Sequence, residues 1–292
     1  MKKEINTQEI EALIALLDDS DDVVFNSVQE KIIMLGVSTI PFLQNGFDNS
    51  TDELQKERLA SLLDVFKLQK LNYEIMNWSK NETHDLLNGL ITIAQFGYPN
   101  LDVNQIKSTI NELAKEIEPK IVGKSNYEIM QEMNKVILDK HSFGANFKNY
   151  SGVNNSFINK VIDDKVGNPI MLCMIYLLVA KKLKINLIGI NSPKHFLLAI
   201  TKSKSDEVAF YNDELITQVD YYIDPFNKGN FYGIEKFDKM LNEINFNLND
   251  KVFLPATNLD IIKRVMNNLI YALHTTGEKK SAKDLLKIVD AL

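Results

Sequence analysis

Three residues of this chain have the side chains that covalent acyl transfer through a thiol requires. Cys173, the only cysteine in the sequence, supplies a thiol. His195 could hold the thiol proton, and Asp224 could orient the histidine. They follow one another in the order thiol, imidazole, carboxylate. One chemistry that the sequence suggests is therefore that of a cysteine hydrolase or acyl transferase.

One buried helix and a small sheet are expected to position these side chains. The stretch Pro169–Leu183 is apolar on almost every face, which is typical of a helix inside a core. It is shorter than the ~20 residues of a membrane-spanning helix. The apolar segments that carry His195 and Asp224 predict antiparallel strands. The expected strands are residues 187–190, 195–201 and 219–224.

The position of the nucleophile argues against thiol chemistry. The first turn of the buried helix is where the helix dipole and free backbone N–H groups would lower the pKa of a thiol. It holds Pro169, Ile170 and Met171, none of which can attack a carbonyl. Cys173 lies about 200° around the helix from Met171, so it faces away if Met171 faces His195. We expect Cys173 to be a small buried hydrophobe; a shifted register that brings it to the site is the alternative.

Four motifs in series resemble the bacterial transglutaminase-like family of SirB-type proteins. They are NSFINKV at 155–161, GNPI at 167–170, PKHFL at 193–197 and IDPFNKG at 223–229. The segment 86–102 and the helices from Leu259 onward also resemble the lead-in and the tail of that family. The resemblance covers roughly residues 86–292.

The resemblance implies a papain- or transglutaminase-like core in which His195 and Asp224 touch on neighbouring strands. It also implies a hydroxyl residue where this chain has Met171, so the chain departs from the pattern at the nucleophile. The catalytic candidates are His195, Asp224 and Cys173, and the binding candidates are Asn155 and Met171. No metal and no cofactor are expected, because the histidines lack the spacing of metal ligands.

The N-terminal part predicts amphipathic helices. Apolar residues at Ile10, Leu13, Ile14 and Leu17 lie on one helical stripe. The segment 16–43 resembles HEAT-type repeats, and two such repeats are too few to be stable alone, so we expect them to pack on the rest of the chain. Further along, Asn154, Asn155 and Ser156 are expected to cap a helix over 157–164, and another helix is expected over 234–243.

Composition indicates a soluble, cytoplasmic protein. The 292 residues are 45% hydrophobic, with a net charge of −6. An acidic balance argues against binding to nucleic acid. One cysteine allows no internal disulfide, and we find no signal peptide and no membrane-spanning helix in the sequence.

The predicted fold class is α+β and mostly helical, with a central buried helix against a small antiparallel sheet. The expected domains are a HEAT-like region (1–80), a helical lead-in (81–140), a transglutaminase-like core (141–254) and a tetratricopeptide-type hairpin (255–292). Three functions stay open: a degenerate module that binds a protein or peptide, an active enzyme with a Cys173–His195–Asp224 triad, and a structural scaffold. Neither a nucleic acid nor a membrane is an expected partner.

Overall fold

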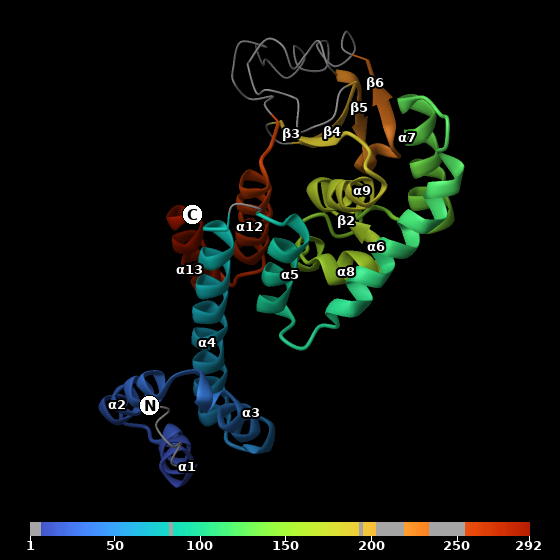
Figure 1. Ribbon diagram of the computed structural model, residues 1–292. Coiled ribbons are helices and arrows are strands. Elements are labelled where there is room, and N and C mark those ends of the chain that lie inside the picture. Colours follow the sequence, from blue (N-terminus) through green and yellow to red (C-terminus); the bar gives the residue numbers. More distant parts are fainter. Residues whose placement is uncertain (1–6, 82–83, 193–194, 203–218, 234–254) are drawn as a thin grey trace. The chain divides into compact units, whose positions relative to one another are not determined.

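The computed structural model describes residues 7–81, 84–192, 195–202, 219–233 and 255–292 (Figure 1). The chain divides into two compact units, Met1–Glu74 and Ile75–Leu292. The expected helix at 234–243 lies outside the described residues.

The described part of the first unit is helical, as its apolar stripes predict. It contains α1 (Thr7–Ala15), η1 (Leu16–Asp18), α2 (Asp22–Leu35), η2 (Gly36–Thr39), α3 (Ile40–Asn49) and the start of α4 (Glu53–Ser79). The Asp21 side chain caps α2 by accepting a hydrogen bond from the N–H of Val23 at 2.7 Å. Leucines and isoleucines from these helices form one core, which includes Leu17, Ile32 and Leu59.

One stretch among the described residues, Asp22–Asn49, is long and apolar enough by length and composition to cross a membrane. It lies near the N-terminus. In the structure this stretch is two α-helices joined by the 3-10 turn η2. The turn starts at Gly36, whose φ of 78° is a conformation that glycine adopts without strain.

The second unit begins with helices that surround its core. They are the end of α4, α5 (Leu86–Gly97), α6 (Val103–Ile117), η3 (Glu118–Lys120), α7 (Asn126–Asn134) and the π-helical segment η4 (Lys135–Lys140). Trp78 on α4 is buried, and its indole N–H donates to the carbonyl of Asp85 at 2.8 Å. A Cβ atom at Gly89 of α5 would lie 3.0 Å from the Trp78 ring, so only glycine allows this approach.

The sheet has four antiparallel strands in the order β3-β4-β5-β6. They are β3 (Leu187–Asn191), β4 (Phe196–Thr201), β5 (Val219–Asp224) and β6 (Asn230–Tyr232). Every residue of β4 is buried, as expected of an inner strand. The predicted strands are thus present, with His195 directly before β4 and Asp224 at the end of β5.

The predicted central helix is α9 (Pro169–Leu183), and it is buried along most of its length. It contacts β3 and β4 on one side and α6 and α8 (Ile158–Asp164) on another, so it fills the space between the sheet and these helices (Figure 1). Asn168 caps α9 by accepting from the N–H of Met171 at 3.0 Å, and Pro169 occupies the first helical position.

Four short elements precede α9, and the cap predicted for one of them, α8, is wrong. Residues Val153–Ser156 form a 3-10 turn, η5, and α8 begins after Phe157 without a side-chain cap. The Asn155 amide does not cap α8 because it donates to the carbonyls of Asn149 and Tyr150, at 2.7 and 3.0 Å. The two-residue strands β1 (Gly144–Ala145) and β2 (Val166–Gly167) pair in parallel nearby.

The chain closes with two packed helices, α12 (Asn258–Thr275) and α13 (Lys279–Ala291), joined through Gly277 at a φ of 93°. This is the expected helical hairpin. A capping box between Thr257 and Asp260 begins α12. One side of α12 contacts α5, η5 and β3, so this helix borders the start of α9 and the sheet.

Candidate active site and the pocket beside it

His195 and Asp224 lie in direct contact. The Nε2 atom of His195 is 2.7 Å from Oδ2 of Asp224, across the paired strands β4 and β5. The contact that we expected between these residues is therefore present. Their catalytic role stays a prediction.

The Asp224 carboxylate is fixed from several sides. Its Oδ1 accepts from the backbone N–H groups of Phe226 and Asn227, at 3.1 and 3.2 Å, in the 3-10 turn η7 (Pro225–Asn227). Its Oδ2 accepts from the amide of Asn227 at 2.6 Å in addition to His195. Asp224 is 1% exposed, so these donors replace water and hold the carboxylate in place.

The imidazole of His195 is oriented by this carboxylate. If Nε2 carries the proton and donates to Asp224, Nδ1 is left as an acceptor. Nδ1 has no hydrogen-bond partner among the residues that the structure describes. The side chain is 26% exposed, and its ring centroid lies 6.4 Å from that of Phe226. His195 thus has the orientation of a general base, and solvent reaches it.

No nucleophile lies at the first turn of α9. Pro169, Ile170 and Met171 are all buried there. A pyrrolidine, an alkyl group and a thioether cannot lose a proton to attack a carbonyl. The helix N-terminus, where a thiol would be activated, therefore contains no reactive group.

The single thiol is closed off from solvent. Cys173 is 0% exposed, and its Sγ donates to the backbone carbonyl of Phe196 at 3.5 Å. Burial, with the nearby charge of Asp224, raises the pKa of the Cys173 thiol well above its ordinary value. The thiol lies against the strand that follows His195. No hydrogen bond joins it to His195 in the described part of the chain.

The two binding candidates lie in the interior. Met171 is fully buried, and Asn155 is 3% exposed. The oxygen of the Asn155 side chain accepts from the amide of Asn146 at 2.8 Å, while its nitrogen donates to two carbonyls of the preceding loop. Asn155 therefore shapes the loop before α8 and does not present free polar atoms to a ligand.

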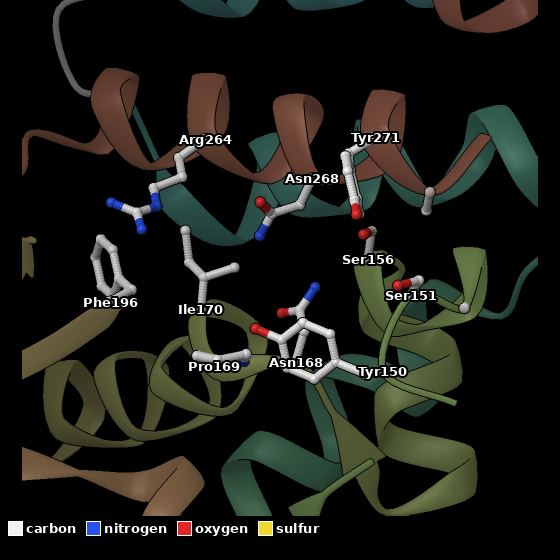
Figure 2. Close-up of a pocket in the computed structure, with 12 residues that line it drawn as sticks. Tyr150, Ser151, Ser156, Asn168, Pro169, Ile170, Phe196, Arg264, Asn268 and Tyr271 are labelled. Atoms are coloured by element: carbon white, nitrogen blue, oxygen red, sulfur yellow. The ribbon is translucent and has the colours of Figure 1, made fainter. Parts of the chain in front are cut away.

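A cavity of about 80 Å³ opens beside the start of α9. Figure 2 shows Arg264, Asn268 and Tyr271 extending from α12 over Asn168, which caps α9, and Ile170 in the first turn of α9. Tyr150, Ser156 and Phe196 line other sides. Phe196 directly follows His195, so the cavity adjoins the histidine strand.

Sequence reasoning missed the α12 residues of this cavity. Arg264, Asn268 and Tyr271 recur at spacings of four and three on a helix whose other residues include Ile261, Ile262, Val265 and Met266. Such spacing places polar side chains on one face. This polar stripe could have indicated the cavity, but a polar stripe on an amphipathic helix is usually a face exposed to solvent.

No group of three or more histidine, cysteine or acidic side chains suited to a metal ion occurs among the described residues.

Known proteins share part of this sequence. Residues 104–267, more than half of the chain, match the transglutaminase-like superfamily. A UPF0162 protein of Xylella fastidiosa (strain 9a5c) is 26% identical over 220 residues, which are 72% of this chain and 73% of that protein. The UPF0162 protein of a second strain, Temecula1, gives the same identity and coverage.

A more distant similarity extends to animals. The human F-box only protein 21 is 21% identical over 250 residues, or 78% of this chain, which spans only 36% of that protein. No solved structure matches this chain. The superfamily match includes η5, α9, His195 and Asp224, the segments that build the site described above. This chain belongs to the transglutaminase-like superfamily.

Proposed function

We propose that this chain is a catalytically degenerate, SirB-type member of its superfamily that binds a protein or peptide in the cytoplasm. The observation that carries the proposal is the composition of the first turn of α9. Where a thiol is needed, the helix has Pro169, Ile170 and Met171. The histidine and the carboxylate of the site are present, and no hydrogen bond joins Cys173 to His195 among the described residues.

The burial and the raised pKa of the Cys173 thiol support the proposal that the chain does not catalyse acyl transfer. The nucleophile in acyl transfer is the thiolate, and burial of Cys173 favours the neutral thiol. The sulfur is also past the first helical turn, where the effect of the helix dipole has faded. A substrate carbonyl would have to enter a fully buried site to reach it.

The surroundings of the site support a binding role. The pocket beside α9 has polar side chains that a scaffold without a ligand would not require (Figure 2). We propose that the helices of residues 1–80 are HEAT-like and that residues 255–292 form a tetratricopeptide-type hairpin around a core at 141–254, with 81–140 as lead-in. Helical repeats present extended surfaces to protein partners.

Alkylation of the only cysteine tests the loss of chemistry. We expect iodoacetamide to label Cys173 slowly in the folded protein at neutral pH and quickly after denaturation, because the thiol is buried. The matched control is the double variant Ile170→Cys/Cys173→Ala, which moves the thiol to the pocket wall and the first helical turn. It should label faster than the wild type.

An active enzyme remains the second candidate, because Cys173 contacts the residue that follows His195. Fast labelling of the folded wild type that is lost in His195→Ala would favour it. So would incorporation of a fluorescent primary amine into a glutamine-containing peptide by the wild type but not by Cys173→Ala. Either result would overturn the proposal of a degenerate site.

A further inference from the structure

A partly buried positive charge at the pocket has no acidic partner among the described residues. Arg264 donates through Nη1 to the side-chain oxygen of Asn191 and, at 2.6 Å, to the carbonyl of Ser192. Both acceptors are neutral. The guanidinium also lies over the Phe196 ring, 5.7 Å from its centroid, and burial lowers the pKa of Arg264. Removing an arginine from water without an opposite charge is unfavourable, which makes an anion the missing partner.

The free edge of this guanidinium is the one suited to an anion. Arginine has five N–H donors, and the contacts to Asn191 and Ser192 use only Nη1. The donors on Nε and Nη2 have no hydrogen-bond partner among the described residues, and together they form the planar fork that binds a carboxylate with two parallel hydrogen bonds. Arg264 lines the pocket (Figure 2), so this fork is available there.

Asn168 supplies a second, independent donor to the same space. It is 7% exposed and lines the pocket. Its oxygen accepts from the N–H of Met171, whereas its amide nitrogen has no partner among the described residues and points into the pocket toward α12 (Figure 2). An amide nitrogen without a protein acceptor is a donor that a ligand oxygen can use.

The start of α9 adds to this preference for an anion. The first turn of a helix leaves N–H groups unpaired. Pro169 has none, and the N–H groups of Met171 and Leu172 donate to Asn168, so the N–H of Ile170 is the one without a partner among the described residues. The helix dipole also favours negative charge at this end.

The charge count selects the class of anion. Among the residues that the structure describes, Arg264 is the only charged side chain that lines the pocket; its other polar lining residues are serine, asparagine and tyrosine. One positive charge balances a carboxylate, whereas a phosphate group at neutral pH carries about −1.5 to −2. We propose that this pocket binds a carboxylate, held by Arg264 and Asn168. We take the carboxylate to be the C-terminus of a bound peptide, and this part of the inference rests on the peptide-binding function proposed above.

Four probes test this inference on the full chain. They are acetyl-Ala-Ala with a free C-terminus, the same peptide with an amidated C-terminus, acetate, and inorganic phosphate. Binding is followed by calorimetry and by ¹H–¹⁵N spectra of the Arg264 and Asn168 side chains. We expect the free acid to bind and to shift both signals, and the amide to bind roughly tenfold or more weakly, because it lacks the charge that the guanidinium pairs with.

Variants assign the binding to the pocket. Arg264→Gln should weaken binding of the acid by roughly tenfold or more. The matched control, Lys263→Gln, removes the same charge from the neighbouring residue of α12, which does not line the pocket, and should leave binding unchanged. If Arg264→Gln fails to fold, Asn268→Leu serves instead, because the Asn268 side chain makes no hydrogen bond among the described residues; it should weaken binding by narrowing the pocket.

The outcomes separate this inference from the proposed function. Equal binding of acid and amide would keep peptide binding and overturn the carboxylate site. Binding of acetate that Arg264→Gln abolishes, without binding of either peptide, would support the carboxylate site and remove the peptide as its source. Binding of phosphate alone, or of no probe, would overturn the carboxylate site, while cysteine labelling would still test the degenerate active site.

Discussion

Asp224 is the residue on which the local geometry of the site depends, through the contacts of its carboxylate. It joins the imidazole of His195, two backbone N–H groups of η7 and the amide of Asn227. In an enzyme such a carboxylate orients the base. In a degenerate member of the superfamily, the same contacts still have a structural effect, because they fix the turn after β5.

We predict that Asp224→Ala lowers the free energy of unfolding by roughly 2–4 kcal/mol, because it leaves several buried donors without an acceptor. Urea unfolding measures the loss. Asp284→Ala, which removes a carboxylate from the surface helix α13, should change stability by no more than about 0.5 kcal/mol. Equal effects of the two substitutions would show that the contacts around Asp224 do not stabilise the folded chain.

Sequence reasoning located some of these residues and missed others for physical reasons. The pairing of His195 with Asp224 could be predicted because each lies in an apolar, strand-like segment within a recognisable motif. Arg264 could not, because its importance comes from the absence of an acidic partner, which is a fact of three-dimensional packing. The orientation of Cys173 could be predicted only relative to Met171, because the spacing of two residues fixes the angle between them on the helix but not which of them faces His195.

Individual elements are linked by ion pairs as well as by packing, and Glu116 shows how. This residue of α6 pairs with Lys140 of η4 at 2.7 Å, with His141 at 3.0 Å and with Lys120 at 3.2 Å. Hydrogen bonds from Lys140 and then His141 lower the pKa of Glu116 to about 2. The charged carboxylate thus links α6 to the segment that leads into β1.

The lowered pKa of Glu116 determines how the stability of the folded chain changes with pH. The native state holds the proton of Glu116 less tightly than the unfolded chain, whose ordinary glutamate pKa is 4.5. The contribution of Glu116 to stability is therefore fully present above that value and is lost as the pH falls toward 2. Because the pair lies at the surface, water and salt weaken it, and the effect is small.

We therefore expect Glu116→Gln to be less stable than the wild type at pH 7, with a difference that shrinks as the pH falls from 4.5 toward 2. Thermal unfolding in low salt at several pH values measures it. The control is Glu118→Gln on the neighbouring 3-10 turn, for which no ion pair occurs among the described residues. A difference that stays constant over this pH range would contradict the role of the charged carboxylate.

Elements with one strong hydrophobic pattern could be predicted from the sequence. Elements whose ends depend on which hydrogen bonds a polar side chain makes could not. The all-round apolar stretch could only be a core helix, and it became α9. The start of α8 was wrong because Asn155 bonds to loop carbonyls that no helical pattern reveals. The π-helical segment Lys135–Lys140 continues the apolar stripe of α7, so sequence alone shows one uninterrupted helix there.

At the scale of the whole molecule, two compact units share one continuous helix. The division falls between Glu74 and Ile75, inside α4. The sequence placed the end of the first region at residue 80, near the end of that helix, because the helical pattern has no break where the units meet. A boundary that depends on which residues pack together leaves no local signal in a helix.

The sole tryptophan allows the two units to be observed separately. Trp78 belongs to the second unit and packs beside His84 and Gly89. Its fluorescence therefore reports unfolding of that unit, while far-UV circular dichroism reports both. The first unit has its own buried core, which includes Leu59 at 0% exposure.

We predict that the two units unfold in separate transitions. Leu59→Ala should cost roughly 2–5 kcal/mol in the first unit and shift part of the dichroism transition to lower urea, while the midpoint of Trp78 fluorescence stays unchanged. The matched substitution Leu269→Ala, at a fully buried position of α12 in the second unit, should shift the fluorescence midpoint. If each variant moves both signals equally, the chain unfolds as one cooperative body, and the two cores stabilise one another.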